Sequence, residues 1–289
     1  MTISVVMIVK NEEVMLPICL ESVKGVDEII IADTGSTDRT IEIARKYTDK
    51  IFCNYVWNDD FAEARNYAKS KSRGDWILSI DADEVLYDVG AVREAVALAE
   101  QHQAKAVDVF CVTGENTGFY YPRLFKNVPE VFWEGCIHNT LSVIGEKLGN
   151  VRFLIKNSPA HANDPDRSFR ILKKDVETRY HPRSMYYLGR EYWVRGDYQN
   201  AVVILGRYVL FSTQLPEKAD AFLIMSKAFW AMKQPDDARD AVLQAIAINA
   251  NFKEAIVHMA AMSWEKNAKQ WNKMAETASN EDVLFIRTP

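Results

Sequence analysis

The sequence predicts an α/β domain with a parallel, doubly wound sheet over residues 1–163, followed by an all-α domain of helical repeats over residues 164–289. Three observations support this. Strand-like and helix-like segments alternate over the first 110 residues, the order typical of βαβ units. Polar residues follow the ends of several predicted strands. One pattern of apolar and small residues then recurs after residue 164.

Continuous apolar runs predict the strands of the first domain, because strands buried on both faces have no polar positions. They are Ile3–Val9, Glu28–Ala32, Ile51–Val56, Trp76–Ile80 and Val107–Val112. Residues at helical spacing predict helices between them, through Leu16 and Leu20, through Ile41, Ala44 and Tyr47, over Phe61–Ser70 and over Gly90–His102. Asn11 is expected to cap the first helix, and the Ser and Thr residues of the turn 33–38 to cap the second.

From residue 114 to 160 the apolar runs are shorter and are separated by Gly and Pro. They predict strands at Tyr120–Phe125, Ile137–Ile144 and Val151–Ile155. We interpret this segment as a mixed extension of the sheet.

The recurring pattern lies in a region that otherwise predicts only helices. Its first copy comprises Leu188-Gly189, Tyr192, Ala201, Leu205 and Tyr208, and its second, 37 positions later, Met225-Ser226, Phe229, Ala238, Val242 and Ala245. A third copy starts at Met259-Ala260 and Ser263, 34 positions on, and then fades, as a terminal cap would. The spacing is typical of tetratricopeptide repeats, with small residues where paired helices approach closely; ordinary helical hairpins are the alternative. The aromatic residues are expected in the core: Tyr187, Trp193, Phe229 and Trp230.

Composition narrows the class of protein. Apolar residues form 48% of the chain, and 35 basic residues face 40 acidic ones, so disordered chains and generic basic nucleic-acid binders are disfavoured. The four cysteines, Cys19, Cys53, Cys111 and Cys136, lack CxxC spacing and are expected as buried thiols in a reducing compartment. Residues 1–10 predict a strand instead of a signal peptide, and no run approaches the ~18 apolar residues of a membrane span. A cytoplasmic protein is expected, and attachment to the inner membrane surface through a partner stays open.

The strongest chemical signal is the DxD motif Asp81-Ala82-Asp83 after an apolar strand. Two carboxylates there cannot both enter the core unpaired, and ligands bind at the carboxyl ends of strands in open α/β sheets. Alternate positions of an extended segment point the same way, so both could face one hard divalent cation. A solvated acidic turn is the plain alternative.

Other strand ends add polar residues at the same edge. Lys10-Asn11-Glu12 closes the first strand, and the segment from Asp33 to Asp38 follows the second. Asp33 could accept a hydrogen bond from a base N–H, and the free N–H groups of the next helix favour anions. Arg65 lies on the helix before the Asp81 strand, where a guanidinium could face a phosphate.

Four segments resemble family 2 glycosyltransferases of the GT-A fold, in the branch that joins this domain to tetratricopeptide repeats. They are Val6-Met-Ile-Val-Lys-Asn-Glu-Glu13, Glu28-Ile-Ile-Ile-Ala-Asp-Thr-Gly-Ser-Thr-Asp38, Asp60-Phe-Ala-Glu-Ala-Arg-Asn66 and Gly74-Asp-Trp-Ile-Leu-Ser-Ile-Asp-Ala-Asp-Glu84. Pro122-Arg-Leu-Phe125, Gly135-Cys-Ile-His138 and Ala160-His161 extend the match. The branch includes bacterial and phage enzymes resembling lipopolysaccharide-core and peptide glycosyltransferases.

The resemblance implies a role for each matching residue. The nucleoside, expected to be uridine, and its diphosphate would be held by Val9, Asn11, Glu12, Asp33, Arg65, Asp81 and Ala82. Asp81 and above all Asp83 would bind Mn²⁺ or Mg²⁺, with His161 as a third ligand or as a simple strand-end histidine. The donor would be a UDP-sugar, and the acceptor a glycan, a lipid-linked sugar or a peptide.

The expected reaction is a single inverting displacement, in which a base takes the proton of the acceptor hydroxyl or thiol. Family members often carry Glu after the His of segment 135–138, but here Asn139 stands there and cannot act as a base. Glu134 is the first candidate base and His138 the second; Glu134 as a plain surface carboxylate is the alternative.

Two other functions compete. Asp81-Ala-Asp-Glu-Val-Leu86 also fits a haloacid-dehalogenase-like phosphatase, but the second acidic pair, Asp236-Asp237, falls within the predicted repeats. Because Asn139 replaces the usual Glu, a non-catalytic sugar-nucleotide sensor whose repeats recruit a partner is the other alternative. The repeats could hold the acceptor or form a homodimer.

Overall fold

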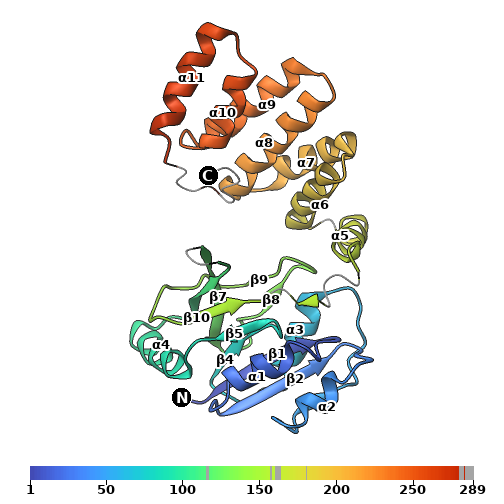
Figure 1. Cartoon of the computed structure of the whole chain (residues 1–289), viewed down its shortest axis with the longest axis vertical. Helices are drawn as coiled ribbons and strands as arrows, with labels where there is room; N and C mark the ends of the chain where they lie inside the picture. The colour runs from blue at the N-terminus through green and yellow to red at the C-terminus, as the bar shows by residue number, and fades with distance from the viewer. Residues whose placement is uncertain (115–116, 157, 160–163, 180, 280–282, 284–289) are drawn as a thin grey trace. The chain divides into compact units, whose positions relative to one another are not determined.

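The computed structural model describes residues 1–114, 117–156, 158–159, 164–179, 181–279 and 283. The chain divides into two compact units, Met1–Arg167 and Ser168–Pro289. The first combines sheet and helices, drawn from blue to green in Figure 1, and the second is helical, drawn from yellow to red.

An eight-stranded sheet in the order β3-β2-β1-β4-β7-β6-β10-β5 organises the described part of the first unit. Its strands are β1 Ile3–Val9, β2 Glu28–Asp33, β3 Ile51–Phe52, β4 Trp76–Ser79, β5 Glu84–Leu86, β6 Ala106–Val112, β7 Gly118–Lys126 and β10 Arg152–Ile155. Strands β8, Trp133–Glu134, and β9, Thr140–Leu141, form a separate antiparallel pair.

The sheet is parallel where the sequence predicts it and mixed beyond. Strands β1 to β4 pair in parallel, with β1 in the centre. β7 runs antiparallel between β4 and β6, β10 is parallel to β6, and β5 returns antiparallel along β10. The mixed extension is therefore not an addition at the edge, because β7 forms a hairpin with β6 and inserts beside β4.

Apolar residues cover both faces of this sheet. Helices α1, Leu16–Ser22, and α4, Val89–His102, bury their apolar residues on one face. Helix α3, Phe61–Lys69, packs on the other face together with β8 and β9. The short helix α2, Thr40–Ala44, buries Ala44 in the first of these two cores.

The predicted side-chain caps of α1 and α2 are absent, whereas Asp60 caps α3 and Asp88 caps α4. Asn11 has a φ of 57°, and this left-handed conformation turns the chain, so α1 begins only at Leu16 with Met15 as its N-cap. Asp38, not a Ser or Thr of its turn, accepts the backbone N–H of Thr40 at the start of α2. Carboxylates at these positions satisfy helix N–H groups that have no intrahelical partner.

Two predicted strands are much shorter than expected. β3 ends at Phe52, because the side chains that follow lie at the surface and Val56 is 82% exposed. Of the predicted strand Ile137–Ile144, only Thr140–Leu141 forms, and Ile144 is 92% exposed. Apolar residues that nothing covers gain little from strand pairing.

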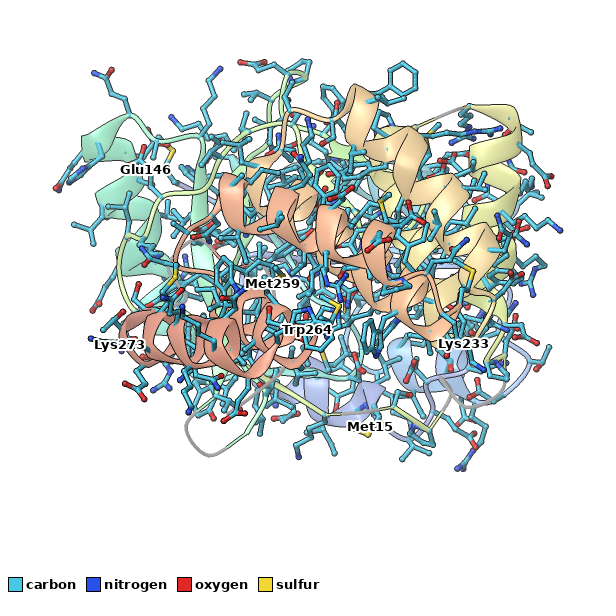
Figure 2. All side chains as sticks on the ribbon, turned by 90° about the horizontal axis from the view of Figure 1, so that it is seen from above. Met15, Glu146, Lys233, Met259, Trp264 and Lys273 are labelled. Atoms are coloured by element: carbon cyan, nitrogen blue, oxygen red, sulfur yellow. The ribbon has the colours of Figure 1, made fainter. Side chains whose placement is uncertain are left out.

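The helices of the second unit follow one another in antiparallel pairs. They are α5 Arg167–Thr178, which begins in the first unit, α6 Pro182–Val194, α7 Tyr198–Phe211, α8 Leu215–Ala231, α9 Pro235–Ile248, α10 Lys253–Ala261 and α11 Glu265–Thr277. Figure 2 views these helices with their side chains, with Met259 labelled on α10 and Lys273 on α11. Of α11, only Ala275 is buried among the described residues, as expected of a capping helix.

The small residues of the repeat act as the sequence predicts. A Cβ atom on Gly189 would lie 2.4 Å from Cγ of Leu205, so α6 and α7 could not pack as they do with a larger residue there. At the equivalent position of the next pair, Ser226 Oγ donates a 2.6 Å hydrogen bond to the carbonyl of Ala238. The predicted core position of Trp230 is wrong, because its side chain is 46% exposed.

None of the helices in the described parts of the chain combines the length and apolar character needed to cross a membrane.

Candidate functional site

The carboxyl ends of β1, β2 and β4 meet at one edge of the sheet. Val9 pairs with Asp33, and Val6 pairs with Ser79, so the three parallel strands end side by side. The polar segments that follow them, including residues 10–13, 34–38 and 81–83, therefore collect at this edge. Crevices at the carboxyl ends of strands are where open α/β sheets bind ligands.

The loop after β2 is folded around Asp33. Its carboxylate is buried and accepts hydrogen bonds from the backbone N–H groups of Gly35 and Ser36, both at 3.1 Å. The carbonyl of Val9 accepts a 2.9 Å bond from the backbone N–H of Thr34, which ties the two strand ends together. Asp33 is thus fixed in place, with further acceptor positions on its two oxygens.

The loop after β1 is fastened to the loop after β2 by side chains. Asn11 accepts a 2.7 Å hydrogen bond from the backbone N–H of Thr37, and its own N–H donates to Ser36 Oγ at 3.0 Å. The backbone N–H of Glu12 donates to Thr40 Oγ1 at 2.7 Å. The predicted capping residue Asn11 therefore positions two loops at the strand edge.

A largely buried cluster of four charged side chains lies behind this edge, in which Asp81 is the most exposed member at 29% of its side chain. Arg65 reaches one oxygen of Asp81 at 2.7 Å, and Arg123 reaches the other at 3.0 Å. The same Arg123 Nη2 also contacts Glu84 at 2.8 Å, and Glu84 accepts the backbone N–H of Asp81. The DxD segment is therefore clamped between two arginines that come from α3 and β7.

Burial and nearby charges shift the pKa values of the two carboxylates of the cluster in opposite directions. Burial disfavours the charged form of Asp81, but Arg65 and Arg123 outweigh this and hold the pKa of Asp81 well below its usual range. Burial raises the pKa of Glu84 to about 7, with Arg123 opposing the rise and Asp81 adding to it. Asp81 is the permanent anion of the pair.

Each of the two arginines has one N–H group that makes no hydrogen bond within the described residues. The Nε–H groups of Arg65 and of Arg123 are buried and have no hydrogen-bond partner among the described residues. Buried donors in proteins are nearly always paired, so such an exception calls for an explanation. Because both N–H groups are enclosed by the protein, a ligand could reach them only if the surrounding side chains moved.

Asp83 lies in a different environment from Asp81. Its carboxylate is buried, lies 3.4 Å from the backbone N–H of Ser158, and its carbonyl accepts a 2.7 Å bond from the N–H of Lys156. Ser158 Oγ donates a 2.7 Å bond to Glu12, so one serine links Glu12 and Asp83. The carboxylate oxygens of Asp83 and Glu12 are of the kind that a hard divalent cation prefers as ligands.

The third predicted metal ligand, His161, lies outside the described residues. Within the described ones, no group of three or more His, Cys, Asp or Glu side chains is arranged to hold a metal ion.

The β8–β9 segment joins this site through α3. Asn66 donates to the carbonyl of Trp133 at 2.9 Å and accepts its N–H at 2.9 Å, so it pairs with the backbone as a neighbouring strand would. The guanidinium of Arg65 lies 5.3 Å from the centre of the Trp133 ring. The residue after Trp133 is the candidate base Glu134, whose side chain is exposed.

The loop after β8 holds the second candidate base. The N–H of Phe61, at the start of α3, donates to the carbonyl of Cys136 at 2.8 Å. His138 is exposed and has a φ of 51°, and the buried Asn139 donates its side-chain N–H to the carbonyl of Gly135. Asn139 thus closes the turn that presents His138, a bond that an ionised Glu at this position could not donate.

The structure reveals two contributors, Arg123 and Ser158, to which the sequence assigned no role. Arg123 could have been noticed as a charged residue inside an apolar strand pattern. For Ser158 the sequence held no signal, because its role depends on the approach of β10 to β5.

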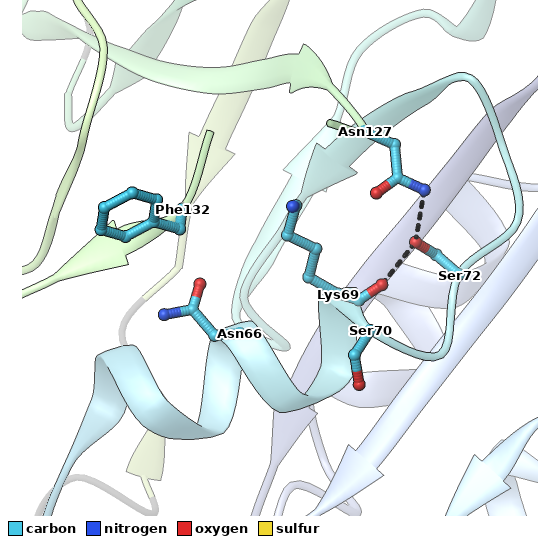
Figure 3. A pocket seen from close by; sticks show the side chains of 6 residues that line it. All are labelled: Asn66, Lys69, Ser70, Ser72, Asn127 and Phe132. Atoms are coloured by element: carbon cyan, nitrogen blue, oxygen red, sulfur yellow. Dashed lines mark hydrogen bonds between the residues drawn. The ribbon is translucent and has the colours of Figure 1, made fainter. Parts of the chain in front are cut away.

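A small polar cavity of about 200 Å³ lies elsewhere on the first unit, lined by Asn66, Lys69, Ser70, Ser72, Asn127 and Phe132 (Figure 3). Asn127 also donates to the carbonyl of Gly74, which precedes β4, so the cavity lies toward the amino end of that strand. Asn127 bonds Ser72 and Ser72 bonds the Lys69 carbonyl, so its polar groups are largely satisfied by one another.

Residues 4–156 match the model of the family described as glycosyl transferase family 2. Among curated proteins, a TPR repeat-containing protein of Synechococcus elongatus is 41% identical over 140 residues, 47% of this chain and 34% of its own. The SPbeta prophage-derived glycosyltransferase SunS of Bacillus subtilis is 33% identical over 146 residues, 47% of this chain and 34% of its own. The chain thus spans about a third of the length of these relatives.

Two solved structures resemble parts or most of the chain. The structure of S. aureus TarS 1-349 in complex with UDP-GlcNAc covers 96% of this chain and 91% of its own, at 14% identity and a TM-score of 0.46. Pseudomonas aeruginosa pilF covers 40% of this chain and 54% of its own, at 17% identity and a TM-score of 0.37.

Proposed function

The chain belongs to glycosyl transferase family 2, and we propose that it transfers a hexose from a UDP-sugar to an acceptor hydroxyl or thiol with inversion. The observation that supports this most is the convergence of Asp33, Asp81 and Asp83 at the carboxyl edge of the sheet within the matched residues. Glycan, lipid-linked sugar and peptide are the acceptors in question.

The nucleoside would bind between the loops after β1 and β2. Asp33, whose orientation the N–H groups of Gly35 and Ser36 fix, would accept the N–H of the uracil ring. Asn11 and Glu12 would line the same crevice from the loop after β1, together with the backbone of Val9. A base that offers an N–H donor where Asp33 lies would be preferred over one that does not.

The diphosphate would lie against the two arginines. Asp81 holds Arg65 and Arg123 side by side through one hydrogen bond to each. The exposed parts of their guanidinium groups would meet phosphate oxygens beside Ala82. Pre-positioned guanidinium groups stabilise the negative charge that grows on the departing nucleoside diphosphate.

The residues fit a metal ion at Asp83 better than at Asp81. Both oxygens of Asp81 already accept from arginines, whereas the carboxylates of Asp83 and Glu12 are brought together through Ser158. Asp83 would hold Mn²⁺ or Mg²⁺ with His161 as a further ligand, and the cation would add its charge to that of the arginines as the diphosphate departs.

A base beside the acceptor completes the proposed reaction. Glu134 or, second, His138 would take the proton of the acceptor as its oxygen or sulfur attacks the anomeric carbon. Both residues flank the loop that Asn66 and Asn139 hold in shape. The departure at Asn139 from the usual Glu would thus leave the loop intact and move the base to one of its neighbours.

Calorimetric titration of UDP into the chain, with and without Mn²⁺, tests the donor site. We expect binding that Mn²⁺ tightens, loss of the metal effect in Asp83→Ala, and weaker binding with the metal effect retained in Asp33→Asn. The control Asp49→Ala removes an exposed carboxylate away from the strand edge and should behave as wild type. An Mn²⁺ effect that survives in Asp83→Ala would refute the metal assignment, and the absence of any nucleotide binding would refute the donor site.

A sugar-nucleotide sensor without turnover is the second candidate, favoured by the engagement of Asn139 with Gly135. Release of UDP from UDP-hexoses on incubation with the chain separates the two. Steady release that Glu134→Gln or His138→Gln abolishes supports the transferase, whereas binding without release supports the sensor. The phosphatase alternative gains no support, since Asp236 and Asp237 lie in the first turn of α9.

A further inference from the structure

The polar cavity of the first unit lies toward the amino end of β4, away from the strand edge that carries Asp81 and Asp83. Two of its lining residues, Asn66 and Lys69, come from the last turn of α3, and the others follow α3, follow β7 or precede β8 (Figure 3). Its volume is about 200 Å³, and a water molecule of the bulk liquid takes about 30 Å³. The cavity therefore has room for a molecule of about six or seven non-hydrogen atoms.

Lys69 brings a positive charge to this cavity without a carboxylate beside it. Its Nζ donates a 2.8 Å hydrogen bond to the carbonyl of Val128. Among the described residues no Asp or Glu forms an ion pair with this ammonium, and the nearby Glu130 pairs with Lys105 at 3.2 Å. Because an ammonium has three N–H donors, two of them remain for a ligand.

Partial burial gives the missing counterion its importance. Lys69 is half-buried, and burial lowers the pKa of its ammonium, while the charge of Glu130 opposes this shift. A cation that has lost part of its water gains more from a nearby anion than a fully solvated one does, because the local dielectric constant is lower. An anion in the cavity would therefore restore part of the stabilisation that burial removes.

Two amide side chains of the cavity have fixed orientations and unused hydrogen-bonding atoms. Asn66 is held by both backbone groups of Trp133, to which it gives only one of its two N–H donors. Asn127 gives both of its N–H donors, at 3.2 Å to Ser72 Oγ and at 3.0 Å to the carbonyl of Gly74. Its Oδ1 has no partner within the described part of the chain. Beside the ammonium, the cavity thus offers one amide donor and one carbonyl acceptor.

The carbonyl groups at the end of α3 are occupied by the residues that follow the helix. The N–H of Ser70 donates to the carbonyl of Asn66 at 3.0 Å. Both the N–H and the hydroxyl of Ser72 donate to the carbonyl of Lys69, at 3.0 Å and 2.7 Å. Unpaired carbonyl groups at a helix end carry partial negative charge, and these bonds reduce it. The charge of Lys69 therefore sets the preference of the cavity.

We propose that this cavity binds a small hydroxylated anion. The carboxylate or phosphate oxygens of the ligand accept from Lys69 and Asn66, and a hydroxyl group beside them donates to Asn127 Oδ1. The ring of Phe132, which is 40% exposed, lines the cavity and contacts the carbon atoms of the ligand. A few placed polar groups beside an aromatic wall are typical of small-molecule sites.

Size and charge exclude other ligands. A neutral polyol would leave the ammonium of Lys69 without a counterion, and a nucleotide exceeds the volume of about 200 Å³. The proposal does not depend on the proposed transferase function, because no lining residue of the cavity binds the donor there.

Calorimetric titration of the full chain tests the site with glycerate, inorganic phosphate, propionate and neutral glycerol. We expect glycerate or phosphate to bind and glycerol not to bind; tighter binding of glycerate identifies a carboxylic acid as the ligand, and tighter binding of phosphate a phosphate group. Lys69→Met should weaken the binding about tenfold or more, because hydrogen bonds to a charged group are lost. Lys69→Arg should keep most of it. Asn127→Ala should remove any preference for glycerate over propionate, which lacks the hydroxyl groups.

Lys71→Met is the matched control for Lys69→Met. Lys71 follows α3 closely, but its ammonium lies 5.6 Å and 4.5 Å from the ring centres of Phe52 and Tyr67, and it does not line the cavity. This variant should bind the anion as wild type does. Unchanged thermal unfolding of the Lys69 and Lys71 variants excludes a folding defect.

Four results would overturn the proposal: neither anion bound, equal affinity in Lys69→Met and wild type, glycerol bound as tightly as glycerate, or displacement of the anion by UDP, which would place it at the donor site. UDP titration of the same proteins separates this proposal from the transferase. If wild type fails to bind UDP, the donor site fails, and the comparison of Lys69→Met with Lys71→Met still decides on the cavity.

Discussion

The two units of this chain use buried charge in different ways. In the first unit, Arg65, Asp81, Glu84 and Arg123 form one cluster at the edge of the sheet, and two of its buried N–H donors lack partners among the described residues. In the second unit, the least exposed ion pairs join neighbouring first helices of the repeat, as Arg190 with Asp220 and Lys227 with Glu254 do. The first arrangement concentrates charge around one strand end, and the second links successive helices of the repeats.

The largest effect on stability is expected from the removal of Arg123, the cation that Asp81 and Glu84 share. Arg123→Met leaves Asp81 and Glu84 buried with less compensation, and the loss of one partner of a buried ion pair costs about 3–5 kcal/mol. Urea unfolding should show this loss, together with a large drop in UDP affinity.

The double variant Arg123→Met/Glu84→Gln serves as the control. It removes one of the two stranded carboxylates, so it should recover part of the stability while UDP binding stays weak. If Arg123→Met proves as stable as wild type, the cluster does not depend on its charge balance.

In the second unit, the largest loss of stability is expected when the residue at the contact between α6 and α7 is enlarged. Gly189→Leu places a side chain where even a Cβ atom would lie 2.4 Å from Leu205, and such overpacking costs about 1–3 kcal/mol. The matched change Gly206→Ala, on α7 with no atom near the new Cβ, should stabilise by about 0.5–1 kcal/mol because alanine favours the helix. A loss in both variants would mean that helix contact is not the cause.

The sequence predicted some features of each unit better than others, depending on whether the contacting residues lie at regular spacing in the chain. The repeat register, with Gly189 and Ser226 at the close contacts, could be seen in the spacing because its partners recur at fixed intervals. The strand ends Asp33 and Asp81 could be predicted because apolar runs end there. The place of β7 in the sheet could not be predicted, since its position between β4 and β6 depends on a hairpin with β6.

The ion pairs of Asp81 with Arg65 and Arg123 could not be predicted from the sequence for the same reason. Arg123 lies 42 positions from Asp81, and no local pattern links the two.

Asn11 shows a limit of another kind, because a good capping residue took a left-handed conformation and bonded Thr37 across the crevice. Its tertiary partners, not its local preference, decided its role. Trp230, an aromatic residue expected in the core, is 46% exposed near the end of α8.

Acid should weaken the second unit through His258. Burial and the charge of Lys227 lower the pKa of His258 to about 4, with Glu254 opposing, and its Nε2 is buried without a partner among the described residues. The unfolded chain binds a proton near pH 6.5, whereas the folded chain does so only near pH 4, so stability falls as pH drops through this window. Urea unfolding at pH 7.5, 5.5 and 4.5 measures the slope.

The control is His258→Gln, which cannot titrate. It should lose this part of the pH dependence while the part due to carboxylates remains. An identical pH slope in His258→Gln and wild type would show that the imidazole takes up its proton equally in the folded and unfolded chain.

The smallest effect is expected where a cation lies at the surface. Arg195, at the end of α6, forms a 3.2 Å ion pair with Glu191, and both side chains are about a third exposed. Its guanidinium also lies 4.3 Å from the ring of Phe169 on α5. Because solvent screens the pair and the ring contact adds little, Arg195→Met should cost about 0.2–1 kcal/mol. The same substitution at Arg123 is the matched comparison, and it removes a guanidinium that is 11% exposed and contacts two carboxylates. If urea unfolding gave equal losses for the two, burial would not be what distinguishes the charges of the sheet edge from those of the repeats.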